Sequence, residues 1–84
     1  MKVRKVTYNY HYWFRADWRR KHEASQLFNE MRKWLHECLD LSDYRARYDN
    51  RDYKYVIDFR EEHQYTFFAL CWDSRVAEFQ REKI

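Results

Sequence analysis

The fold is decided by residues 47–72, RYDNRDYKYVIDFREEHQYTFFALCW. This stretch is long enough for two or more strands, but it has no Gly or Pro, so other residues must form the turns between them. Polar and apolar residues alternate through much of this stretch, as is typical of β-strands. Asp and Asn tolerate turn conformations better than most residues, so we expect a tight hairpin at Asp49-Asn50. The pattern then predicts a strand over Arg51–Phe59, a turn near Glu61-Glu62 and a strand over Gln64–Trp72.

The flanking segments supply the remaining elements. Alternation over Lys2–Phe14 predicts a long first strand, and Tyr44–Tyr48 predicts a strand that enters the hairpin. Between them, apolar residues at helical spacing predict an amphipathic helix with Asp17 as its cap; they are Ala24, Leu27, Phe28, Met31, Trp34, Leu35, Cys38 and Leu39. A short helix over Arg75–Lys83 is expected to end the chain.

The expected fold class is α+β, in one domain over residues 1–84. We predict an antiparallel β-sheet of three to four strands, with one long amphipathic helix packed on one face and a short C-terminal helix. The predicted order is β-α-β-β-β-α.

With two-residue turns, the sheet face away from the long helix carries both charge and aromatic rings. Its predicted binding residues are Arg45, Arg47, Lys54, Tyr65 and Phe67. Rings that stack on bases, beside cations that neutralise phosphates, are typical of single-strand nucleic-acid binders. A longer turn through residues 60–63 would instead place both rings inside, and pairing of Arg47 with Asp52 would make the face a solvated surface.

A basic run precedes the long helix and is the second candidate site. It contains Arg15, Arg19, Arg20 and Lys21. Cations in a first helical turn oppose the helix dipole, so either the helix begins nearer Glu23 or the run meets an acidic partner. A solvated loop explains it equally well.

Composition excludes several function classes. The chain has no Gly, so glycine-rich phosphate loops and dinucleotide fingerprints are absent. Cys38 and Cys71 lie far apart, which predicts free thiols and a cytoplasmic protein, and no apolar run reaches the length of a membrane span. His and Cys show no metal-ligand spacing, so we expect no metal and no cofactor.

Catalysis has one weak candidate, the cluster Asp58, Glu61, Glu62 and His63, where an imidazole and carboxylates could act on RNA. The segment REEHQYTFF, residues 60–68, is similar to the strand-turn-strand segment of short basic RNA-cleaving toxins of toxin–antitoxin pairs. This resemblance covers only that segment. The second N-terminal helix, the glycine-bearing loop and the terminal His or Tyr of those toxins are missing.

The net charge of +3 is modest, and aromatic residues make up 21% of the chain. Tyr and Trp are enriched in the cores of interfaces. We therefore expect a small non-catalytic interaction protein, of the kind encoded by phages and mobile elements, that binds a partner protein or a second copy of itself through the aromatic and basic sheet face. The alternative is a single-stranded RNA or DNA binder, and an RNA-cleaving toxin ranks third.

Overall fold

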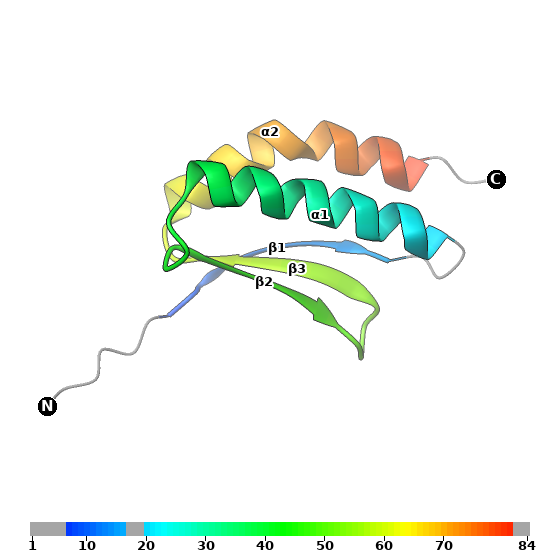
Figure 1. The fold of residues 1–84 in the computed structure, drawn as a ribbon, viewed down its shortest axis with the longest axis horizontal. Helices are drawn as coiled ribbons and strands as arrows, with labels where there is room; N and C mark the ends of the chain where they lie inside the picture. The colour runs from blue at the N-terminus through cyan, green and yellow to red at the C-terminus, as the bar shows by residue number, and fades with distance from the viewer. Residues whose placement is uncertain (1–6, 17–19, 82–84) are drawn as a thin grey trace, which may run out of the picture.

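The computed structural model describes residues 7–16 and 20–81 (Figure 1). Its elements are β1 (Tyr10–Arg15), α1 (Lys21–Cys38), β2 (Tyr44–Asp49), β3 (Lys54–Phe59) and α2 (Glu62–Arg81). The predicted strand over Lys2–Phe14 is longer than β1, and residues 1–6 and the expected cap Asp17 lie outside the described part of the chain.

The three strands form one antiparallel sheet in the order β1-β3-β2. The central strand β3 pairs with both neighbours, so that Phe59 lies opposite Tyr10 on one side and Tyr44 on the other. Both helices lie on the same side of this sheet, as Figure 1 shows. The α+β class and the antiparallel sheet followed by a C-terminal helix are therefore confirmed.

The predicted fourth strand over Gln64–Trp72 is wrong, because these residues belong to α2, which also takes up the expected short helix. The helical signal is a stripe at i, i+3, i+4 and i+7 spacing: Tyr65, Phe68, Ala69, Trp72, Val76 and Phe79 all join or pack against the core. Since no Gly or Pro interrupts residues 62–81, nothing in the sequence breaks the helix there. Glu62 in the first turn favours its start.

One face of the sheet carries two helices rather than the single long helix that was expected. The buried residues of α1 are Ala24, Leu27, Phe28, Met31 and Leu35, and they share the core with Phe68, Trp72 and Val76 of α2. Phe68 is fully buried, and its ring centroid lies 4.9 Å from that of Tyr12 and 5.3 Å from that of Phe59. Cys38, expected in the buried stripe, is exposed at the end of α1.

The β2–β3 hairpin has a longer loop than the two-residue turn that was predicted, because Asp49 pairs with Lys54. Asp49 Oδ1 accepts a hydrogen bond from the backbone N–H of Arg51 at 2.9 Å, and Tyr53 takes a left-handed backbone with φ 53°. The partners of β2 move by an even number of residues relative to the prediction. Each side chain of the hairpin strands therefore stays on its predicted face.

Candidate functional site: the helix-free face of the sheet

The side of the sheet opposite the helices is the helix-free face. Side chains alternate along a strand, and Tyr12, Phe14, Ile57 and Phe59 point into the core, so their neighbours point to the other side. The register sets these neighbours in three rows: His11–Asp58–Arg45, Trp13–Val56–Arg47 and Arg15–Lys54–Asp49. Each row thus contains one residue from each of β1, β3 and β2, so all three strands contribute to this surface.

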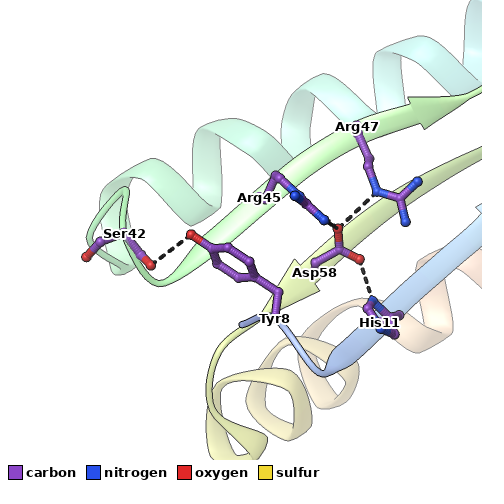
Figure 2. A network of polar contacts seen from close by, with 6 residues as sticks. All are labelled: Tyr8, His11, Ser42, Arg45, Arg47 and Asp58. Carbon is purple, nitrogen blue, oxygen red and sulfur yellow. Dashed lines mark hydrogen bonds and ion pairs between the residues drawn. The ribbon is translucent and has the colours of Figure 1, made fainter. Parts of the chain in front are cut away.

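Asp58, in the middle of the first row, is 0% exposed although no helix covers it. Three basic side chains from the two outer strands enclose its carboxylate (Figure 2). His11 Nδ1 lies 2.5 Å from Oδ1, whereas Arg45 and Arg47 both donate to Oδ2. A buried carboxylate is stable only when it is paired and hydrogen-bonded, and here both oxygens are satisfied.

The two arginines contact Asp58 differently. Arg45 donates from Nε at 3.2 Å and from Nη2 at 3.1 Å, whereas Arg47 donates from Nε alone at 3.0 Å. The two Nη groups of Arg47 point away from the carboxylate in Figure 2, and within residues 7–16 and 20–81 they have no acceptor. They present a planar pair of donors of the kind that binds phosphate or carboxylate.

Tyr8 covers the outer end of this cluster. Its hydroxyl donates to the backbone carbonyl of Ser42 at 3.2 Å, and the guanidinium carbon of Arg45 lies 5.3 Å from its ring centroid. The ring therefore helps to hold Arg45 by a cation–π contact, as well as shielding the ion pair from water.

The environment of Asp58 keeps it ionised. Burial raises the pKa of its carboxyl, but the hydrogen bonds from Arg47, His11 and Arg45 lower it by more, so the pKa lies below its ordinary value of 3.8. At neutral pH the carboxylate is thus a fixed negative charge that orients the basic side chains around it.

Trp13 supplies the principal exposed ring of the face and is 49% exposed. It lies next to Val56 in the middle row, and Lys54 Nζ lies 4.5 Å from its ring centroid. Cation and ring therefore alternate across the surface: Arg45 beside Tyr8, then Lys54 beside Trp13.

Cations outnumber the accessible carboxylates on this face. Arg15, Arg45, Arg47 and Lys54 are matched by the buried Asp58, by Asp49, and by Asp52 of the adjoining loop, whose Oδ2 lies 3.6 Å from Lys54 Nζ. Asp49 also accepts two backbone N–H groups of its own loop. The surface offered to solvent is consequently basic and aromatic.

The predicted binding residues divide between this face and the opposite side of the molecule. Arg45, Arg47 and Lys54 lie together as expected, but Tyr65 and Phe67 do not join them, because both belong to α2. Tyr65 packs against the core near Tyr10 and Tyr12.

Phe67 instead belongs to an exposed apolar patch of the helix layer, which comprises Trp34, Phe67 and Leu70. Its ring centroid lies 5.5 Å from that of Trp34, and Leu70 is 78% exposed one turn further along α2. This second surface is apolar, in contrast to the helix-free face.

The basic run does not form one patch. Arg15 ends β1 on the helix-free face, Lys21 is exposed in the first turn of α1, and Arg19 lies outside the described residues. Arg20 has a structural role, because it bonds Glu23 and the carbonyl of Phe79, with its guanidinium 4.2 Å from the Phe79 ring centroid. Arg20 thus ties the start of α1 to the end of α2.

Sequence reasoning missed His11 and Trp13 as residues of this face, and it gave Asp58 only a weak catalytic role instead of its place at the centre of the ion cluster. The signal was present in the alternation of β1, where His11 and Trp13 separate Tyr10, Tyr12 and Phe14. It was overlooked because the prediction paired β3 with a fourth strand, whereas the neighbour of β3 is β1.

The other candidate chemistries find no support in the described residues. Asp58 pairs with His11 instead of His63, and the segment 60–68 leads into α2, so the strand-turn-strand likeness to RNA-cleaving toxins is absent. Within residues 7–16 and 20–81, no group of three or more His, Cys, Asp or Glu could hold a metal ion. No helix in the same ranges is long and apolar enough to cross a membrane.

Comparison of the chain with protein-family models, with curated proteins and with solved structures finds no match.

Proposed function

We propose that this chain is a non-catalytic binding protein that takes single-stranded nucleic acid on the helix-free face of its sheet. The observation that carries the proposal is the half-exposed ring of Trp13 beside Lys54, on a face where the buried Asp58 also holds Arg45 and Arg47 in place. Such proteins neutralise phosphates with Lys and Arg and stack bases on aromatic rings, and both groups alternate here.

Pre-organisation supports the proposal further. Arg45 and Arg47 keep one geometry because Asp58 binds both, so less side-chain entropy is lost when an anion binds. The free Nη pair of Arg47 is a phosphate donor set, and Arg15 and Lys54 add charge along the same face.

A direct test measures binding of the purified protein to a fluorescent single-stranded oligonucleotide by anisotropy over a salt series. We expect the affinity to fall with salt, with a log-log slope of about −0.7 per phosphate contact. Binding should also quench part of the tryptophan fluorescence, since a stacked base lies against the indole ring of Trp13.

Lys54→Glu is the informative variant, and Lys33→Glu on the exposed side of α1 is its matched control with the same change in net charge. We expect Lys54→Glu to weaken binding about tenfold or more and to flatten the salt slope, since attraction to phosphate becomes repulsion. Equal effects of the two variants, or no binding at low salt, would contradict the proposal.

A second candidate function is favoured by the apolar patch Trp34, Phe67 and Leu70, where Phe67 is 54% exposed. Exposed apolar patches of this kind mark contacts with a protein partner or a second copy. Light scattering of the wild type and of Phe67→Ser tests the homodimer: a dimer mass that the substitution halves would support it, and a monomer mass in both would argue against it.

A further inference from the structure

A groove lies between the free edge of β1 and α2, next to the helix-free face. It encloses about 440 Å³, within the size range of small-ligand sites. Its lining includes His11 and Trp13 from β1, and Tyr65, Asp73, Val76 and Gln80 from α2.

The groove is continuous with the proposed binding face. His11 and Trp13 belong both to the rows of that face and to the wall of the groove. Since β1 is an edge strand in the order β1-β3-β2, no other strand of the described residues lies between the two surfaces. A strand of nucleic acid whose phosphates lie on Arg45 and Arg47 can therefore turn one base over the edge of β1.

Both polar and apolar side chains line the groove, and the apolar ones include aromatic rings. Trp13 and Tyr65 provide aromatic rings from opposite elements, and Val76 provides an aliphatic surface between α2 and the strand. Stacking on an aromatic ring is worth about 1–3 kcal/mol per base and is available to every base type. The rings therefore explain retention of a base but not selection among bases.

Asp73 is the carboxylate among the residues that line the groove. Tyr12 donates its hydroxyl proton to Asp73 Oδ1 at 2.7 Å, which fixes the orientation of the carboxylate. Burial raises the pKa of the Tyr12 phenol well above its ordinary value of 10, and the hydrogen bond to Asp73 raises it further, so Tyr12 remains a donor. Asp73 Oδ2 has no donor within residues 7–16 and 20–81, and an ionised carboxylate can only accept.

An acceptor at this position distinguishes the bases by their Watson–Crick edges. Cytosine and adenine present an exocyclic amino group beside a ring-nitrogen acceptor, and guanine presents an amino group beside a ring N–H. The single donor of uracil or thymine lies between two carbonyl oxygens, which a carboxylate repels.

We infer that this groove holds one unstacked base of the bound strand and prefers bases with an exocyclic amino group, with Asp73 as the acceptor that selects them. The inference rests on the proposed function. It assigns base preference to a site at the edge of the sheet, whereas the helix-free face itself binds phosphates without regard to sequence.

The test compares oligo-dC with oligo-dT of equal length by fluorescence anisotropy at one salt concentration, because both are weakly stacking pyrimidine strands. We expect the wild type to bind oligo-dC roughly tenfold more tightly, as one specific base contact provides. Asp73→Asn keeps an oxygen that can accept from Tyr12 but adds an N–H donor. It should reduce the ratio of the two affinities toward one while leaving binding of oligo-dT and its salt slope nearly unchanged.

Asp40→Asn, the same change at an exposed site after α1, is the matched control and should keep the wild-type ratio. Equal affinity of the wild type for both strands would overturn the base preference while leaving the proposed function intact. An equal loss for both strands in Asp73→Asn would also overturn it, because the residue would then act through charge or folding alone. If neither strand binds at low salt, the proposed function fails and the inference fails with it.

Discussion

The two faces of this small sheet bury their central residues by different means. On the covered face, Phe59 and Ile57 lie beneath two helices, in an aromatic core that includes Phe68. On the helix-free face, Asp58 is equally inaccessible, but its cover consists of basic side chains from the neighbouring strands. An ion cluster thus takes the place of a layer of secondary structure, and the comparison shows how a face can be ordered and still remain open to a ligand.

The two faces also differ in how accessible their cover is. The covered face is sealed by elements that cannot leave without unfolding the domain. The side chains of His11, Arg45 and Arg47 are each about half exposed, so a ligand can reach them without any change in the sheet. We therefore expect substitutions on the covered face to affect mainly stability, and those on the helix-free face to affect mainly binding.

The largest expected effect is on the covered face, at Phe68. This side chain is 0% exposed and packs against four other rings, so Phe68→Ala should lower the free energy of unfolding by about 3–5 kcal/mol. Urea denaturation monitored by circular dichroism measures it. Phe67→Ala is the adjacent control and should cost about 1 kcal/mol or less, because that ring is half exposed. Similar losses for both would break the distinction between core and surface on α2.

An intermediate effect is expected at Asp58 on the helix-free face. Asp58→Asn removes the charge that holds three basic side chains, and should cost about 2 kcal/mol at pH 7, since those side chains can turn to water. Because the pKa of Asp58 is lower in the folded than in the unfolded protein, its stabilisation is complete above the ordinary pKa of 3.8. It is lost as the pH falls through the lower, folded-state pKa.

Urea unfolding at a series of pH values separates this contribution from that of other carboxylates. The gap in stability between wild type and Asp58→Asn should be present at about pH 5 and should close as the pH falls below the ordinary pKa of Asp58. A gap that persists at the lowest pH would mean that the substitution acts by packing, and the ion cluster would no longer explain the burial on this face.

The smallest expected effect belongs to neither face. Tyr53 holds a left-handed backbone in the β2–β3 loop and is 63% exposed, so its side chain contributes little packing. Tyr53→Gly should relieve strain and, after the entropy that Gly adds to the unfolded chain, raise stability by about 0.5 kcal/mol. Thermal unfolding measures the change, with Tyr53→Ala as the control that keeps the strain. A loss of oligonucleotide binding in Tyr53→Gly would extend the binding surface into the loop.

The sequence was sufficient for the elements whose periodicity is unmistakable. The stripe of α1, from Ala24 to Leu35, and the alternation of β2 and β3 are local signals, and all three elements form close to their predicted positions, although β3 begins at Lys54 rather than Arg51. The hairpin side chains lie on their predicted faces although the predicted turn was too short. Side chains alternate with a period of two, and the pairing partners moved by an even number of residues.

Alternation gave the wrong prediction of a strand at residues 64–72, because the apolar positions there fit both a strand period of two and a helical stripe. Length decides between them, since the stripe continues through Val76 to Phe79 without a break. The Asp58 cluster was beyond local reasoning for another reason. It joins His11 to Asp58 across the whole of α1, and only the strand order β1-β3-β2 makes them neighbours.

The central place of β3 also bears on how the chain folds as it is synthesised. Of the three strands, β3 is synthesised last, and both ladders of the sheet include it. β1 therefore cannot complete its pairing until residue 59 has been synthesised. The β2–β3 hairpin closes over a short loop, whereas pairing of β1 must enclose all of α1, and contacts between distant residues form slowly. We expect the hairpin to nucleate folding and the arrival of β1 to complete it, so that the ion cluster around Asp58 forms last and its assembly marks the finished fold.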